Sequence, residues 1–129
     1  MPLTAFDHVN LRTANLDGMI RWYGEILGLH PGPRPPFNVG GAWLYLGDRP
    51  YVHLVDIPGQ PAAIPNAALE HFAFRANGMA GFLGRLDDRK IPYSIDEVPE
   101  FPIVQVNFRD PDGNHIHVDF DKAELPSQA

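Results

Sequence analysis

The feature that most constrains this chain is an internal repeat marked by histidines. Two pairs of histidines recur at nearly the same spacing: His71 follows His8 by 63 residues, and His117 follows His53 by 64. The segments that contain them match as well, "DHVNLR" with "EHFAFR" and "YVHLVD" with "HIHVDF". Two matches at nearly the same offset predict a duplicated unit of about sixty residues.

Each half is expected to fold as a strand, a helix and further strands. The alternating "FDHVNLRT" predicts the opening strand. The apolar positions of "LDGMIRWYGEILG" fit one face of a helix, with Asn15 and Asp17 as candidate N-caps and Gly28 as its end. The Pro- and Gly-rich "PGPRPPFNVGG" predicts a loop, and "AWLYLGDRPYVHLVD" predicts two strands around a turn. The second half predicts a strand at "EHFAFRA", a helix at "GMAGFLGRLDDRK" and strands at "IPYSIDEV", "IVQVNFRD" and "NHIHVDF", the last after the turn "DPDG".

These segments divide the chain into two modules, a linker and a tail. We expect the first module at residues 1–58, a Pro-rich linker at 59–67, the second module at 68–122 and a C-terminal tail at 123–129. A single module of about sixty residues buries too little apolar surface to be dependably stable alone. The two kinds of module are therefore expected to pair.

The last predicted strand places two imidazoles and a carboxylate on one face. Polar and apolar residues alternate in "HIHVDF", and alternate residues of a strand share a face. One face therefore carries His115, His117 and Asp119, and the other carries Ile116, Val118 and Phe120. If the histidine-bearing strands of both modules line one concavity, four histidines meet there: His8, His53, His71 and His117. Imidazole is the commonest metal ligand, so we predict a divalent metal site, with iron, nickel, cobalt, manganese and zinc all open. The alternative for each histidine is an ordinary hydrogen-bonded core or surface role. His30 is expected to be a helix-end or loop residue, and for His115 simple exposure is favoured over contact with a ligand histidine or substrate.

Three further residues are candidates for substrate binding. Arg12 and Arg75 each lie four residues after a predicted ligand, so each shares that ligand's face of its strand. An inward arginine binds a carboxylate or phosphate group of a substrate, and an ion pair with a neighbouring acid is the equally weighted alternative. Trp43 is expected to line the substrate pocket, with ordinary core packing as its alternative.

Composition excludes several classes of protein. The net charge of −6, with acidic residues spread along the chain, argues against nucleic acid or an anionic membrane as a partner. The chain has no cysteine, which excludes a disulfide scaffold, a thiolate metal site and a cysteine nucleophile. The segment "MPLTAFDHVN" lacks a signal-peptide pattern, and no run approaches the roughly 18 apolar residues of a membrane span. A cytoplasmic location is the expectation.

With these segments placed, the sequence resembles the vicinal oxygen chelate superfamily, which includes glyoxalase I, extradiol dioxygenases and the bleomycin- and fosfomycin-resistance proteins. The resemblance covers nearly the whole chain and is strongest in "RWYGEILGL" and "DPDGN". It implies an α+β fold of two paired βαβββ modules, each with a curved mixed sheet, that form a metal-binding concavity. It also implies that the metal ligands are His8, His53, His71 and His117.

The chain departs from this family at two ligand positions. Glyoxalase I has glutamate at the second and fourth positions, and one of the two moves the substrate proton; here His53 and His117 stand at these catalytic positions. Four neutral imidazoles leave the metal its full charge but remove the carboxylate base. Arg12 matches an arginine that contacts glutathione, whereas Ile57 replaces the expected asparagine, so glutathione recognition is not expected.

Three functions stay open. The first is lyase or isomerase chemistry on a small anionic substrate chelated through vicinal oxygens. The second is an O₂-dependent dioxygenase, ring-cleaving or related, and the third is a non-catalytic protein that binds a small molecule or confers resistance. The modules either close on each other within one chain or pair across two chains. We expect a homodimer with sites shared between chains, because C₂ is the commonest oligomer symmetry.

Overall fold

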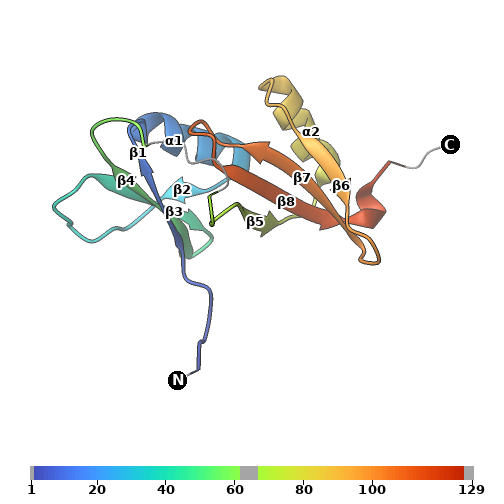
Figure 1. The fold of residues 1–129 in the computed structure, drawn as a ribbon, viewed down its shortest axis with the longest axis horizontal. Coiled ribbons are helices and arrows are strands. Elements are labelled where there is room, and N and C mark those ends of the chain that lie inside the picture. Colours follow the sequence, from blue (N-terminus) through green and yellow to red (C-terminus); the bar gives the residue numbers. More distant parts are fainter. Residues whose placement is uncertain (1, 62–66, 127–129) are drawn as a thin grey trace. The chain divides into compact units, whose positions relative to one another are not determined.

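The computed structural model describes residues 2–61 and 67–126, which fall into two compact units (Figure 1). The first unit is Met1–Ile64 and the second is Pro65–Ala129. The division falls within the predicted linker, of which residues 62–66 lie outside the described residues, as do residues 127–129 of the predicted tail. Each unit is described by itself below.

The first unit contains one four-stranded mixed sheet. Its elements are β1 (Val9–Thr13), α1 (Leu16–Trp22), the π-helix η1 (Tyr23–Leu27), β2 (His30–Pro31), β3 (Gly41–Leu46) and β4 (Arg49–Asp56). The strand order is β1-β4-β3-β2, with β1 parallel to β4 and the other pairs antiparallel.

The second unit repeats this topology. Its elements are β5 (Phe72–Arg75), α2 (Met79–Asp88), β6 (Ser94–Glu97), β7 (Ile103–Arg109), β8 (His115–Asp121) and the 3₁₀-helix η2 (Lys122–Glu124). The order β5-β8-β7-β6 again has one parallel pair, β5 with β8, and two antiparallel pairs. The predicted α+β fold of two βαβββ modules with mixed sheets is therefore confirmed.

The two sheets also share one register. The central histidine of each sheet has these neighbours on the adjacent strands: Asn10 and Trp43 beside His53, and Ala73 and Asn107 beside His117. The other histidine of each pair precedes the neighbour on the parallel strand by two residues: His8 precedes Asn10, and His71 precedes Ala73. Trp43 and Asn107, like the central histidines, are 64 residues apart. The repeat seen in the sequence is thus a repeat of residue pairing in the sheets.

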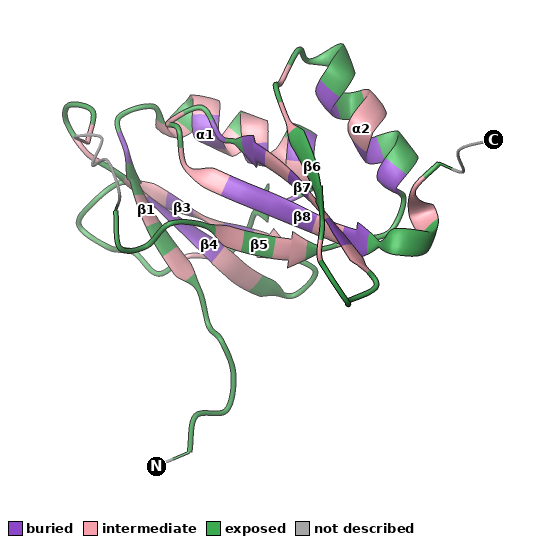
Figure 2. Cartoon of the chain, turned by 45° about the vertical axis from the view of Figure 1, so that its right-hand side comes forward, coloured by how far each residue is buried: buried purple, intermediate pink, exposed green. Residues whose placement is uncertain are grey.

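The helix of each unit packs on one face of its sheet and leaves the other face to the histidines. In the first unit the buried apolar residues include Met19, Tyr23 and Ile26 of the helical segment and Leu44, Val52 and Leu54 of the sheet. In the second, Phe82 of α2 contacts Phe108 and Phe120, with ring centroids 5.6 and 5.7 Å apart, and Figure 2 shows the buried positions along β8 and on one side of α2. Because side chains alternate along a strand, burial of one face assigns the histidines to the other.

The two helices begin differently. Of the two candidate caps, Asn15 caps α1, with its Oδ1 accepting from the Gly18 N–H at 3.3 Å, and Asp17 lies in the first turn. The first helical segment continues through the π-helix and ends at Gly28, whose φ of 71° is left-handed. Helix α2 is capped from afar, because Glu124 Oε1 accepts from the N–H groups of Gly78 and Met79 at 3.0 and 2.9 Å. Glu124, expected in the tail, therefore packs as part of the second unit.

The Pro- and Gly-rich stretch after α1 is not wholly a loop. His30–Pro31 forms the edge strand β2 against β3, so the expectation that proline and glycine exclude regular structure was wrong at this end. Proline is tolerated on an edge strand because its missing N–H is not needed on the outer side. No helix among the described residues is long and apolar enough to cross a membrane.

Candidate metal centre

Three rings stack on the open face of the first sheet. The imidazole of His8, just before β1, lies on that of His53 of β4, with centroids 3.7 Å apart and planes 7° from parallel. Trp43 of β3 stacks on His53 as well, at 4.1 Å and 15°. Two nearly parallel rings this close must occupy opposite faces of His53, so the imidazole is held between His8 and Trp43. The structure therefore brings together three of the predicted site residues.

His53 supplies a buried nitrogen without a partner. The residue is only 7% exposed, and its Nε2 has no hydrogen-bond acceptor or donor among the described residues. Burial, followed by the nearby His8, lowers the pKa of His53 below its ordinary 6.5, which favours the neutral form that binds metals. Leaving such a group unsatisfied costs about 1–3 kcal/mol. A ligand for this nitrogen would remove that cost.

His8 is oriented by the acid that precedes it. Its Nδ1 lies 2.6 Å from Asp7 Oδ2, and this hydrogen bond is the main reason that the pKa of Asp7 is lowered. An ionised carboxylate accepts the Nδ1 proton and leaves Nε2 as the basic nitrogen, the arrangement found in carboxylate–histidine–metal triads. Both histidines of the first unit thus keep Nε2 available.

The second unit brings its own predicted pair together. The rings of His71 and His117 lie 4.6 Å apart at 46°, and His117 is 6% exposed. The Nδ1 of His117 donates to Asp119 Oδ1 at 2.5 Å, and the Nδ1 of His71 lies 3.3 Å from Glu70 Oε1. The carboxylate in "HIHVDF" therefore orients the imidazole two residues before it.

His115 has a different role from the exposed one that the sequence favours. Its side chain is 20% exposed, its Nδ1 contacts the Glu70 carboxylate, and its Nε2 lies 2.8 Å from Asn107 Oδ1. The amide of Asn107 is oriented by its own donation to Asp96 Oδ2 at 3.0 Å. Both nitrogens of His115 therefore have polar partners within the second unit.

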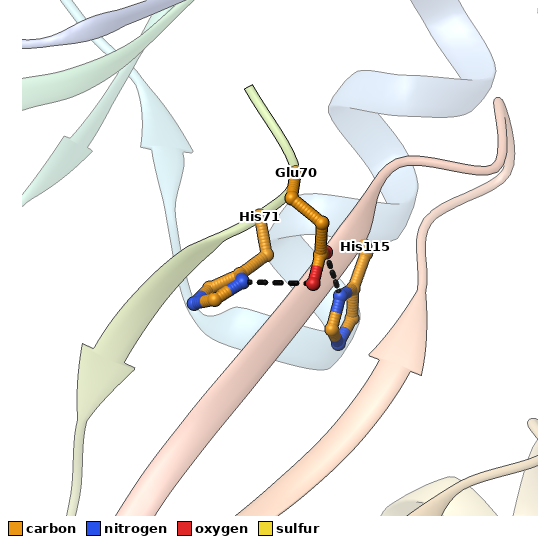
Figure 3. A group of neighbouring side chains, drawn as sticks. All are labelled: Glu70, His71 and His115. Atoms are coloured by element: carbon orange, nitrogen blue, oxygen red, sulfur yellow. Dashed lines mark hydrogen bonds and ion pairs between the residues drawn. The ribbon is translucent and has the colours of Figure 1, made fainter. Parts of the chain in front are cut away.

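Glu70 links the two outer histidines of this face, as Figure 3 shows. Glu70, His71 and His115 each offer a ligand atom within 4.8 Å of the others, so they are an alternative donor set. The pKa of Glu70 is lowered, mainly by its hydrogen bond to His115. His115 has both nitrogens engaged, whereas His71 has no partner for Nε2 among the described residues. Glu70 and His115 therefore orient their neighbours in this arrangement.

Sequence reasoning missed Glu70 and the network of His115, although one signal was present. The first match of the repeat begins with an acid followed by histidine in both halves, "DH" and "EH". In the structure both acids contact the Nδ1 of the histidine that follows. The repeated acid–histidine dipeptide is thus a sequence signal for an imidazole that a neighbouring carboxylate orients.

Arg12 and Arg75 lie exposed on the histidine faces of their sheets. Arg12 pairs with Val55 of β4, and Arg75 with Asp119 of β8. Within residues 2–61 and 67–126 neither arginine forms a salt bridge. The second unit also has an open pocket of about 510 Å³, whose polar lining is Tyr93, Ser94, Asp96, Asn107, Arg109 and His115.

Comparison with known proteins identifies the same family as the sequence motifs. The model of the Glyoxalase/Bleomycin resistance protein/Dioxygenase superfamily matches residues 5–118. Glyoxylase I 4 of Arabidopsis thaliana is 30% identical over 124 residues, which cover 90% of this chain and 70% of that protein. Biphenyl-2,3-diol 1,2-dioxygenase 2 of Rhodococcus globerulus is 28% identical over 134 residues, 96% of this chain and 66% of that protein.

Solved structures agree at the level of the fold. A glyoxylase/bleomycin resistance protein/dioxygenase domain from Frankia sp. EAN1pec has a TM-score of 0.76 at 23% identity, with 93% of each chain covered. Lactoylglutathione lyase from Agrobacterium tumefaciens has a TM-score of 0.69 at 22% identity, with 98% and 100% covered.

Proposed function

Because the chain belongs to the glyoxalase/bleomycin resistance protein/dioxygenase superfamily, we propose that it is a metal-dependent enzyme acting on a small anionic substrate through two neighbouring oxygens. The proposed ligand atoms are the Nε2 nitrogens of His8, His53, His71 and His117. The observation that carries this proposal is their shared state: each keeps Nε2 without a partner in the described chain, and three hold Nδ1 near a carboxylate.

The donor set fits a divalent transition metal. Neutral imidazoles suit iron, cobalt, nickel and zinc, and the lowered pKa of His53 keeps that ring neutral. When bound, such an ion supplies Lewis acidity that polarises a substrate oxygen. The chain's own residues do the rest: Asp7, Glu70 and Asp119 keep the ligand nitrogens aimed. We propose that the two histidine pairs are two halves of one centre, with His53 and His117 at its catalytic positions.

Lyase or isomerase chemistry is the reaction we favour. Arg12 and Arg75 carry uncompensated charge on the histidine faces and are proposed to position the anionic substrate, while Trp43 covers His53. Histidine at both glutamate positions removes the ligand carboxylate that would move a proton. With Ile57 also in place of a polar residue, turnover of the methylglyoxal–glutathione adduct is expected to be weak.

An O₂-dependent dioxygenase is the second candidate, and the similarity to the Rhodococcus protein favours it. Four protein ligands leave only two positions of an octahedron for substrate and oxygen. A binding protein without chemistry is the third candidate. Oxygen consumption during turnover separates the dioxygenase from the lyase. A metal-loaded protein that binds small molecules but never converts them would be a binding protein, the third candidate.

The proposed assembly is a homodimer whose sites take one module from each chain. Its test is to mix chains that carry His8→Ala with chains that carry His117→Ala. In a shared arrangement one site of the mixed dimer collects both lesions and the other is intact, so part of the metal binding returns. If each site lies within one chain, every site keeps a lesion and mixing restores nothing.

Elemental analysis of protein purified without an affinity tag tests the proposed function first. We expect stoichiometric Fe, Co, Ni, Mn or Zn, followed by activity with that metal in lyase and oxygen-uptake screens. Protein that neither contains nor takes up any of these ions would contradict the proposal.

A further inference from the structure

Arg34, in the loop between β2 and β3, is a held cation without a counter-charge. Its Nη2 donates to the Val39 carbonyl at 2.9 Å, and its Cζ lies 5.0 Å from the Phe37 ring centroid. Its Nε is buried without an acceptor. Across the described residues no carboxylate forms a salt bridge with it. Stacking and one carbonyl therefore hold the guanidinium, and its charge is uncompensated.

The guanidinium lies against the open face of the first sheet, beside His53. A Cβ on Gly41 would lie 2.9 Å from Arg34 Nη2 and 2.2 Å from the Leu54 carbonyl oxygen, so Arg34 occupies space that a side chain at Gly41 would need. Gly41 pairs with Val55, and Val55 pairs with Arg12. The cross-strand row two residues beyond His53 therefore ends at Arg12 on one side and at Gly41, against which the Arg34 guanidinium lies, on the other. The backbones of Arg12 and Gly41 are about two strand spacings of 4.8 Å apart.

An aromatic surface adjoins this pair of cations. Phe37 is 52% exposed, and its ring lies 6.2 Å from that of Trp43, which itself stacks on His53. The loop that carries Phe37 is well tied: the Tyr45 hydroxyl donates to the Pro33 carbonyl at 2.5 Å. A half-exposed aromatic ring on a tied loop, next to two free cations, is the composition of a recognition surface.

We propose that this surface binds the planar, negatively charged end of the substrate, an aromatic carboxylate. Arg34 and Arg12 would pair with the carboxylate, because guanidinium groups match it in geometry as well as in charge. Phe37 and Trp43 would contact the ring. The assignment to a substrate rests on the proposed function, but binding of such an acid to this face needs no metal.

The probe is benzoate, titrated calorimetrically into the full chain in the presence of a chelator. Cyclohexanecarboxylate keeps the charge and loses the planar ring, and benzyl alcohol keeps the ring and loses the charge. We expect benzoate to bind about tenfold tighter than either, since each control removes one of the two contacts. Absence of benzoate binding, or equal binding of cyclohexanecarboxylate, would overturn the proposal.

Variants locate the binding. Arg34→Met is expected to weaken benzoate about tenfold, and Arg34→Lys to weaken it less, because lysine keeps the charge but not the planar fork. Arg21→Met, which removes the same charge from α1, should change nothing. Phe37→Leu should narrow the preference for benzoate over cyclohexanecarboxylate. An Arg34→Met protein that folds and binds benzoate like the wild type would refute the assignment.

Two further readouts separate this inference from its alternatives. If Phe37→Ser converts a dimer to a monomer in sedimentation and leaves benzoate binding unchanged, the patch is a contact between chains and the proposal is wrong. Metal affinity measured in the same variants should not change. A chain that binds benzoate but takes up no metal would support this inference and contradict the proposed function. A chain that takes up metal but does not bind benzoate would support the proposed function and contradict this inference.

Discussion

The two units share topology and register but surround their histidines with different chemistry. Trp43 stacks on His53, whereas the equivalent Asn107 bonds to His115 and Asp96 at the edge of a polar network. The duplicated backbone therefore sets where the histidines stand, and the neighbouring side chains decide how each is controlled. In the first unit stacking and burial control His53 and the Asp7 carboxylate orients His8, whereas in the second unit carboxylates contact both His71 and His117.

The position two residues after each central histidine makes the contrast sharpest. Asp119 accepts from His117, while the equivalent Val55 offers no acceptor side chain to His53. Desolvation keeps His53 neutral, and a carboxylate fixes the tautomer of His117. We infer that the first half presents an apolar and cationic surface to substrate, whereas carboxylates in both halves aim ligand nitrogens.

Loss of a central histidine is expected to have the largest effect. His53→Ala and His117→Ala each remove a proposed ligand, so metal affinity should fall by more than the roughly 10–100-fold that loss of an outer partner causes. Calorimetric titration with Co²⁺ or Ni²⁺ measures it, and His30→Ala, an exposed histidine on β2, is the matched control. Wild-type affinity in either variant would remove that residue from the site.

Asp119→Asn comes next, because it weakens the orientation of His117 without removing the imidazole. We expect metal affinity to fall about tenfold, as for other carboxylates that support a ligand histidine. Val55→Thr at the equivalent position should leave affinity unchanged, since no imidazole nitrogen is held there. Equal effects of the two substitutions would contradict the proposed difference between the units.

The third prediction concerns the protonation of His53 in the metal-free protein. Burial lowers its pKa below 6.5, so between that folded pKa and 6.5 the unfolded chain binds more protons than the folded chain. The free energy of unfolding should therefore fall as pH drops from 6.5 toward the folded pKa. His8→Gln removes the second cause of this shift and should raise the pKa of His53. NMR titration of the imidazoles checks both shifts, and a value for His53 at or above 6.5 would be inconsistent with this account.

The smallest effects are expected at the helix N-termini, where the units also differ. Asn15→Ala removes an acceptor for one backbone N–H, and Glu124→Ala removes an acceptor for two. We expect the free energy of unfolding to fall by about 1 kcal/mol in the first variant and by about 1–2 kcal/mol in the second. Urea unfolding measures both. Glu124→Gln, which keeps an acceptor oxygen, should fall between the wild type and the alanine variant. A Glu124→Ala protein as stable as the wild type would show that the contact contributes nothing.

Much of the fold could be predicted from the sequence because its signals are local and occur twice. Alternation located the strands, Asn15 and Gly28 bounded the first helical segment, and the 63- and 64-residue offsets found the histidine pairs. The edge strand at His30–Pro31 was missed because its pairing with β3, rather than its own composition, makes it a strand.

The surroundings of the histidines could not be predicted in the same way. Glu70 reaches His115 across 45 residues of sequence, and Glu124 reaches Gly78 across 46. Arg34 lies over Gly41 because the loop folds back on the sheet. Such contacts depend on side-chain directions after folding, which neither periodicity nor spacing records.

We propose that the two histidine pairs form one metal centre, and X-ray absorption spectroscopy of the Co- or Ni-loaded full chain counts the imidazoles around each ion. We expect one ion per chain with four imidazole nitrogens at about 2.0–2.1 Å, the range of other metal–imidazole bonds. His8→Ala should reduce the imidazole count by one. Two ions per chain, each with two imidazoles, would show that the two units bind metal separately and would rule out a single four-histidine centre.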